Sequence, residues 1–321
     1  MYIKQLKDIS LEFINKTVEM IVLISEINVK TSRNGKKYAD ITIQDNSKMM
    51  EAKYWDYEEN EEKIQAFDEN EIVEIEAIVG EYNGQLQITI RKIEKATRDN
   101  YNIKDFIPTS DWDTDVLDKG LKYYYSKIES THMRELVERM IFAKDFYKDF
   151  FVYPAARRVH HNFYHGLLQH TLEVLKYAYT VATTKKLTQR QVDRLIVMTM
   201  LHDWGKILEY KALPQVGFTD EGTMLGHIFM GAHHTLNKIN EIDNFPEEDK
   251  LVILNGILGH HGFLEFGSPV LPKTVEAQIL HQSDKMSGDV ESILSFIEED
   301  TNDTETFTAR LWNMGTEYYK K

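Results

Sequence analysis

Between residues 17 and 95, apolar and polar residues alternate along five short segments, which is the pattern of half-buried β-strands. The segments read TVEMIVLISEINVKT, KYADITIQD, MMEAKYWD, EIVEIEAIVGEY and QLQITIRKIEK. Turn-forming pairs at Asn34-Gly35, Asp45-Asn46 and Asn83-Gly84 separate neighbouring strands, and a helical stretch, EEKIQAFDEN, stands between the third and the fourth. The pattern predicts a small β-barrel, although a small β-sandwich would fit the same strands.

Downstream of this region the hydrophobic period becomes that of helices. Residues 96–150 contain Pro108 and a cluster of Asp, Ser and Thr, which indicates a linker with helix caps before two amphipathic segments. Residues 151–300 are helical by period, and an acidic stretch near residue 300 precedes an aromatic tail. We therefore predict an α+β multidomain chain with a barrel (1–95), a linker and helical segment (96–150), an all-α domain (151–300) and a C-terminal tail (301–321).

Composition narrows the class of protein. The chain has 321 residues and no cysteine, which suggests about two domains and excludes disulfides and thiolate metal sites. No apolar run approaches the roughly 18 residues that span a membrane, and the first residues do not resemble a signal peptide, so we expect a cytoplasmic protein with no membrane partner. A net charge of −14 disfavours indiscriminate binding to nucleic acid.

Charge is nevertheless segregated along the predicted barrel, whose strand count and size are those of an oligonucleotide-binding (OB) fold. Residues 30–53 carry six Lys or Arg against three Asp or Glu, a local net charge of +3. Single-stranded nucleic acid binds such barrels through phosphate contacts and base stacking. The candidate contacts here are Arg33, Lys36, Lys37, Tyr38, Tyr54 and Trp55. The alternative is that the aromatic residues belong to the core of a purely structural barrel.

A second basic cluster stands before the first long helix of the all-α domain. Arg157, Arg158 and His161 are its candidate contacts to a phosphate backbone, with His160 beside them. Charge alone fits a solvated helix start equally well.

Histidines are concentrated in the all-α domain, where eleven of the twelve lie between residues 160 and 281. Several of them stand in or at the ends of apolar helices, together with two aspartates: His170, His202, Asp203, His227, His260, His261 and Asp284. Five imidazoles and two carboxylates suit a pair of cations such as Mn²⁺, Fe²⁺, Co²⁺ or Zn²⁺ and not Ca²⁺, which prefers oxygen ligands. The alternative is a polar core network, which seldom contains so many ionisable groups.

Two positions in this set leave alternatives open. His234 would share a helical face with His227, and His233 is next to it, so either could replace His227 as a ligand. His281 stands one turn before Asp284 and is read as a residue that orients a ligand or simply packs.

The order His…His-Asp…His…His-His…Asp over residues 155–290 resembles the two-metal form of the HD-domain phosphohydrolases. With the barrel and the segment RRVHHNFYHGLLQHTLEV, nearly the whole chain resembles the YhaM-type bacterial 3′-to-5′ exoribonucleases, except that His165 replaces the first residue of a Gly-Gly pair. The resemblance implies one metal held by His170, His202, Asp203 and Asp284, and another held by Asp203, His227, His260 and His261. It also implies that Asp203 bridges the two metals.

The resemblance implies two divalent metal ions as cofactors, with Mn²⁺ expected first and Co²⁺, Fe²⁺ or Zn²⁺ as alternatives. A water shared by paired metals would attack phosphorus. Lys206, three residues after Asp203, is expected on the same helical side, where its ammonium would contact the scissile phosphate. We expect a 3′-to-5′ exoribonuclease that acts on single-stranded RNA, with single-stranded DNA as a further polymer, and that releases 5′-mononucleotides. A homo-oligomer is expected from the resemblance and the aromatic tail.

Two other functions fit the same residues. The first is a phosphohydrolase of small nucleotides, such as dNTPs, (p)ppGpp or cyclic dinucleotides, with a regulatory barrel. The second is a non-catalytic nucleic-acid-binding protein with a vestigial metal site.

Overall fold

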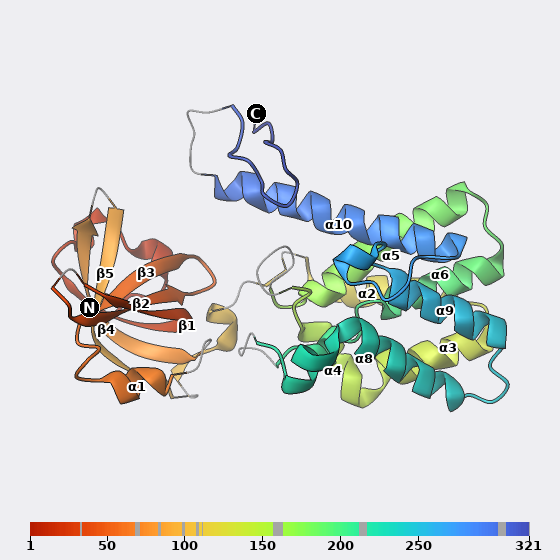
Figure 1. The fold of residues 1–321 in the computed structure, drawn as a ribbon, viewed down its shortest axis with the longest axis horizontal. Coiled ribbons are helices and arrows are strands. Elements are labelled where there is room, and N and C mark those ends of the chain that lie inside the picture. The colour runs from red at the N-terminus through yellow and green to blue at the C-terminus, as the bar shows by residue number, and fades with distance from the viewer. Residues whose placement is uncertain are drawn as a thin grey trace. The chain divides into compact units, whose positions relative to one another are not determined.

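The chain divides into two compact units, each described here by itself (Figure 1). One unit comprises Met1–Thr109 with Ala212–Gly217, and the other comprises Ser110–Lys211 with Phe218–Lys321. The computed structural model describes residues 1–32, 34–67, 71–82, 85–97, 100–106, 109–110, 112–156, 163–211, 217–300 and 306–320.

The N-terminal unit is a closed five-stranded barrel with the strand order β1-β2-β3-β5-β4 (Figure 1). Its elements are β1 (Thr17–Thr31), β2 (Lys37–Gln44), β3 (Met49–Tyr54), α1 (Glu61–Gln65), β4 (Ile72–Tyr82) and β5 (Gln85–Lys95). Strands β3 and β5 are parallel, whereas the other neighbouring pairs are antiparallel. The five predicted strands and the helix between the third and fourth are confirmed, and the barrel is the correct choice over the sandwich.

Alternation along the strands decides which side chains fill the barrel. On β2, Ala39, Ile41 and Ile43 are fully buried, while Tyr38 before Ala39 and Thr42 before Ile43 are only partly buried. Successive strand residues point to opposite faces, so one set forms the core and the other the outer surface. The core of the barrel is therefore built from the apolar positions of the period-2 pattern.

The segment that follows β5 is associated with the barrel. The backbone carbonyl of Asp105 accepts a hydrogen bond from the N–H of Asn46, and Phe106 is buried. Helices α2 (Thr114–Tyr125), α3 (Thr131–Val137) and α4 (Lys144–Val152) belong instead to the C-terminal unit. The predicted region 96–150 thus divides between the two units near residue 110.

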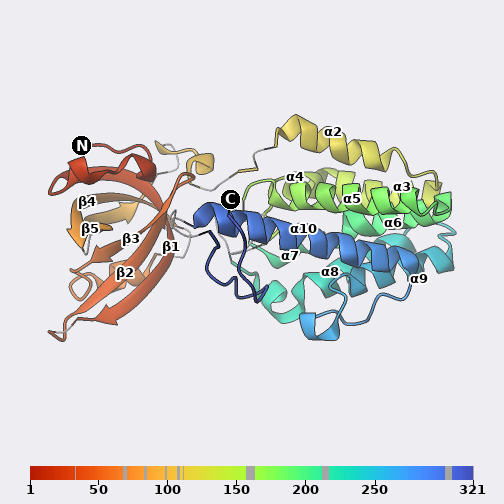
Figure 2. The same cartoon turned by 90° about the horizontal axis from the view of Figure 1, so that it is seen from above.

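The C-terminal unit is built from α-helices that surround one apolar core. The remaining helices are α5 (Gly166–Thr184), α6 (Gln189–Leu201), α7 (Lys206–Glu209), α8 (Asp220–Asn240), α9 (Glu247–Gly259) and α10 (Val275–Glu299). The long helix α10 packs against α5, α6 and α9, and its path beside α5 is visible in Figure 2.

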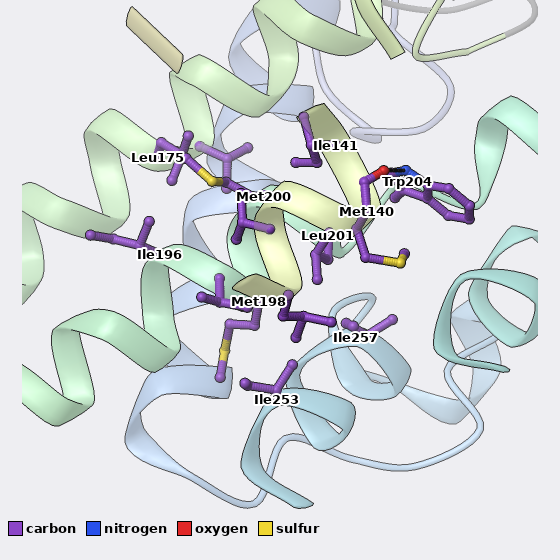
Figure 3. Close-up of a cluster of buried hydrophobic side chains, with 14 of the residues drawn as sticks. Met140, Ile141, Leu175, Ile196, Met198, Met200, Leu201, Trp204, Ile253 and Ile257 are labelled. Atoms are coloured by element: carbon purple, nitrogen blue, oxygen red, sulfur yellow. Dashed lines mark hydrogen bonds between the residues drawn. The ribbon is translucent and has the colours of Figure 1, made fainter. Parts of the chain in front are cut away.

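Helix α6 is the centre of this core. Thr188 begins it with a reciprocal capping box to Gln191, and every residue from Val192 to Leu201 is buried. Figure 3 shows its Ile196, Met198 and Leu201 among apolar side chains of neighbouring segments. From Leu195 to Leu201 the helix is apolar on nearly all sides, which is stable only when other elements surround it, so its C-terminal end is also buried.

Residues 306–320 at the C-terminal end pair with one another through bridges at Phe307–Tyr319 and Leu311–Thr316. Trp312, between Leu311 and Thr316 in the sequence, is 83% exposed. None of the helices in the described part of the chain has the length and apolarity that would allow it to cross a membrane.

Candidate metal centre

The end of α6 brings two polar residues into the apolar core. His202 and Asp203 directly follow Leu201, and they are 0% and 3% exposed. Adjacent residues at a helix end point in different directions. Because a buried carboxylate without partners is costly, the surrounding helices must supply partners for Asp203.

One group of side chains surrounds the Oδ2 atom of Asp203. Nε2 of His170, on α5, lies 3.5 Å from this oxygen and 3.1 Å from Oδ1 of Asp284, on α10. Nε2 of His202 lies 3.4 Å from Asp203 Oδ2 and 3.3 Å from Nε2 of His170. Two imidazoles and two carboxylates converge here, a ligand set that suits borderline divalent cations.

A second group surrounds the other oxygen, Asp203 Oδ1. Nε2 of His227, on α8, lies 3.5 Å from it, and Nε2 of His260, just after α9, lies 3.6 Å from it. The ligand atoms of His227, His260 and His261 all lie within 4.8 Å of one another. The two oxygens of Asp203 therefore face two separate groups, as would suit a carboxylate shared by two cations.

The ring nitrogens that face away from Asp203 have their own partners. Nδ1 of His202 donates to the carbonyl of Thr199 at 2.7 Å, and Nδ1 of His260 donates to the carbonyl of Ile257 at 2.7 Å. A carbonyl only accepts, so Nδ1 carries the proton. In the neutral ring the Nε2 lone pair then points toward Asp203, as metal ligation requires.

His170 is oriented through a serine. The hydroxyl of Ser287 donates to Oε2 of Glu173 at 2.8 Å and lies 3.2 Å from Nδ1 of His170. Because its proton is directed to Glu173, the serine oxygen accepts from Nδ1 of His170. This leaves Nε2 of His170 as the lone-pair nitrogen of the ring.

Three buried polar atoms at the centre of the site have no hydrogen-bond partner among the described residues. They are Asp203 Oδ1, His227 Nε2 and His260 Nε2. A buried polar atom without a partner costs about 1–3 kcal/mol, and such groups call for an explanation. Three acceptors that face one another would be satisfied by a cation, so the residues fit a divalent metal.

The charges in the site keep the carboxylates ionised. Burial alone would raise the pKa of Asp203, but Lys206, His202 and His227 hold it well below the usual range. Burial opposes ionisation of Asp284 as well, yet the neighbouring imidazoles of His170 and His202 lower its pKa. Both aspartates are therefore available as anionic ligands at neutral pH.

The imidazoles are influenced in different directions. Burial, together with the charges of His261 and His202, lowers the pKa of His260 well below its usual value. Burial also lowers the pKa of His170. Burial acts in the same direction on His202, but the neighbouring Asp203 outweighs it and raises the pKa of that ring.

The structure places the remaining predicted residues of this domain as follows. His234 packs against Trp204, with ring centroids 4.8 Å apart, and not beside Asp203, so His227 is the histidine that joins the second group. His281 donates from Nδ1 to the carbonyl of His260 at 2.8 Å, which fixes the backbone next to a candidate ligand.

His165 is the N-cap of α5 and adopts a left-handed backbone conformation (φ 67°), which glycine adopts at the lowest cost. Its ring is buried and Nδ1 lies 2.7 Å from the carbonyl of Phe151. The side chain that replaces a glycine here thus makes a structural contact.

Lys206 lies on the short helix α7, and its ammonium is 2.6 Å from Oδ2 of Asp203. Its partner in this structure is therefore a candidate metal ligand. Sequence reasoning did not identify Glu209, at the other end of α7, whose carboxylate contacts His227, nor Ser287 and Glu173 behind His170. In the sequence Glu209 stands in an apolar stretch, and a carboxylate in such a stretch is the signal that could have identified it.

On the barrel, Tyr38 and Trp55 form a stacked pair with ring centroids 4.6 Å apart. Trp55 is 39% exposed, and Nζ of Lys53 lies over the Tyr38 ring at 5.4 Å. Tyr54 does not belong to this surface: it is 4% exposed and lies in the barrel core. The prediction for Tyr54 is wrong because this residue shares the inner face of β3 with Met50 and Ala52.

The lysines of the β1–β2 turn lie close to acidic side chains. Lys36 is 3.9 Å from Asp56, and Lys37 is 3.9 Å from Glu61. These acids reduce the local positive charge, so the aromatic pair is the clearer candidate for a binding surface on the barrel. Arg33, Arg157, Arg158 and His161 lie outside the described residues.

Comparisons with known proteins agree with both units. Residues 18–96 match the family model described as an OB-fold nucleic acid binding domain, and residues 167–289 match the HD domain. The HD match implies binding of a divalent metal.

A 3′-5′ exoribonuclease YhaM from Listeria welshimeri is 31% identical over 278 residues, which cover 86% of this chain and 87% of the relative. The chain belongs to the YhaM exoribonuclease family. Family relatives from Listeria innocua (32% identity, 85% of each chain) and Bacillus subtilis (31% identity, 87% of each chain) are likewise named 3′-5′ exoribonuclease YhaM.

Proposed function

We propose that the protein is a metal-dependent 3′-to-5′ exoribonuclease that shortens single-stranded RNA and releases 5′-mononucleotides. The observation that carries the proposal is the Asp203 carboxylate, whose two oxygens face two histidine groups. Membership of the YhaM family supports the direction of cleavage and the RNA substrate. The stacked aromatic pair on the OB barrel supports a polymeric substrate.

When bound, two divalent cations would lower the pKa of a shared water and offset charge on the phosphate oxygens. The two groups around Asp203 would hold these cations, with one oxygen of Asp203 for each. The neighbouring hydrogen bonds keep His202 and His260 in the tautomer that ligates through Nε2. We expect Mn²⁺ as the activating metal.

Lys206 would supply positive charge to the substrate. Burial disfavours its charged form, but Asp203 outweighs burial and raises the pKa of Lys206, so the ammonium is charged at neutral pH. In the loaded site Asp203 would be shared with cations, and the ammonium of Lys206 could then turn to a phosphate oxygen. Lys206 would thus bind the scissile phosphate and offset its charge.

The test is incubation of a 5′-labelled single-stranded RNA with the protein and Mn²⁺. We expect products shortened progressively from the 3′ end, with 5′-mononucleotides released, and no shortening in excess chelator. A single-stranded DNA of the same sequence measures the preference for ribose. An intact RNA alongside rapid hydrolysis of a free nucleotide would reject the proposal and favour a small-nucleotide phosphohydrolase.

Removal of the aromatic pair on the barrel should weaken binding of long RNA. Each stacked base contributes about 1–3 kcal/mol, so we expect Tyr38→Ala or Trp55→Ala to raise the Kd of a long single-stranded RNA about 5- to 150-fold. Fluorescence anisotropy with labelled RNA measures this change.

Hydrolysis of a dinucleotide should stay unchanged in both variants, because it requires only the metal centre. Trp312→Ala removes a more exposed tryptophan elsewhere in the chain and is the matched control. Equal RNA affinities in all three variants would exclude Tyr38 and Trp55 from the binding surface.

A further inference from the structure

The carboxylate of Glu209 is the immediate partner of His227. Its Oε1 atom accepts a hydrogen bond from the backbone N–H of His227 at 3.0 Å. Nδ1 of the same histidine lies 3.2 Å from Oε1 and 3.1 Å from Oε2. One buried side chain therefore contacts both the backbone and the ring of a candidate metal ligand.

A break in α8 creates the backbone half of this contact. Gly226 has φ 72° and ψ 153°, so the helical path is interrupted directly before His227. The N–H of His227 then begins a new helical stretch and lacks a partner from a preceding turn. Glu209 accepts from this N–H and acts as the cap of the second half of α8.

Close packing fixes the position of Glu209. A Cβ atom on Gly222 would lie 2.3 Å from the carbonyl oxygen of Glu209, so the first part of α8 rests directly on this backbone. The N–H of Thr219 donates to the same carbonyl at 2.9 Å, and the Thr219 hydroxyl donates to the carbonyl of Leu208 at 2.9 Å. Glu209 is thus held before any ligand binds.

The contact between the Glu209 carboxylate and the His227 ring affects metal binding. A carboxylate only accepts, so Nδ1 of His227 carries the proton and Nε2 presents its lone pair 3.5 Å from Asp203 Oδ1. A carboxylate behind a ligating imidazole fixes the ring and makes it a stronger ligand. His202 and His260 use backbone carbonyls for the same purpose, which carry no formal charge.

We propose that Glu209 is a positioning residue that sets the metal affinity of the second group, formed by His227, His260 and His261 with Oδ1 of Asp203. It acts through His227 and does not touch the substrate. The inference rests on the two-metal centre of the proposed function.

The test is titration of the metal-free protein with Mn²⁺. Calorimetry measures the affinities and electron paramagnetic resonance monitors the bound ions. We expect the wild type to bind two ions with the spectrum of a coupled pair. In Glu209→Ala, one ion should bind as in the wild type, while the affinity for the other falls about 10- to 100-fold. At intermediate Mn²⁺ the spectrum should be that of an isolated ion.

Glu209→Gln tests the role of the charge. Its amide oxygen can still accept from His227 and so preserves the geometry, but it lacks the negative charge. We expect a loss of affinity at the same site that is smaller than in Glu209→Ala. If circular dichroism shows that Glu209→Ala is unfolded, Glu209→Gln replaces it in the metal titration.

Glu221→Ala is the matched control because it also removes a glutamate carboxylate, from the first turn of α8, where the side chain is exposed. We expect the metal affinities of the wild type.

Two results would overturn the role of Glu209: wild-type affinities in folded Glu209 variants, or equal losses in Glu221→Ala. A wild-type protein that binds no Mn²⁺ and leaves RNA intact would instead refute the proposed function. The two failures are therefore distinguishable.

Discussion

Asp203→Ala is expected to abolish RNA shortening, with a loss of at least about 10³-fold in rate. The substitution removes the carboxylate whose two oxygens face the two histidine groups. Metal activation supplies several kcal/mol of transition-state stabilisation, and each 1.4 kcal/mol or so corresponds to about tenfold in rate. The assay is single-turnover cleavage of labelled RNA, with elemental analysis of the bound metal in the same samples.

Two further variants separate loss of the ligand from loss of the fold. Asp203→Asn keeps the shape of the side chain and a possible partner for Lys206, and it should lose activity to a similar extent. Asp289→Ala removes an exposed carboxylate that pairs with Lys285 on α10, and it should behave as the wild type. Full activity and metal content in Asp203→Asn would exclude the bridging role.

Gly205→Ala is expected to destabilise the C-terminal unit by about 3 kcal/mol and to weaken metal binding. Gly205 has an ordinary helical backbone (φ −59°, ψ −17°), so conformational freedom is not the reason for glycine here. A Cβ atom would lie 2.1 Å from the carbonyl oxygen of His227 and 2.8 Å from the backbone N of Gly231. Helix α8 would have to move, together with His227.

Denaturant unfolding measures the stability of this variant, and Mn²⁺ titration measures its site. Gly120→Ala on α2 is the matched control, because there the Cβ would meet only flexible atoms of Leu172. We expect a change within about 1 kcal/mol for the control. A Gly205→Ala protein as stable as the control, with unaltered metal binding, would contradict the packing argument.

Local patterns predicted most of the barrel. Period-2 alternation and turn pairs are properties of short segments, and they located the five strands and the helix between the third and fourth. The same alternation also predicts which side chains are buried, and residue type alone does not. Met50, Ala52 and Tyr54 share one face of β3, so strand alternation assigns Tyr54 to the core.

The candidate ligands were also accessible from sequence, because a histidine or aspartate at the end of a buried helix needs a partner. The residues that hold the ligands in place could not be predicted from the sequence. Glu209, Ser287 and Glu173 contact ligands across separations of 18 to 117 positions or through another side chain. Such contacts depend on how helices pack. The choice between His227 and His234 likewise required the position of Trp204.

The ends of α6 and α9 repeat one arrangement. In each, the histidine that follows the helix donates to the carbonyl three residues earlier, His202 to Thr199 and His260 to Ile257. Carbonyls in the last turn of a helix lack a backbone donor, so the histidine completes the helix with the nitrogen that is not needed for ligation. If either helix continued for another turn, a backbone amide would take that carbonyl and release the ring. The length of these two helices therefore determines which imidazole nitrogen carries the proton. The residue at which each helix ends thus selects the nitrogen that remains free to bind a metal.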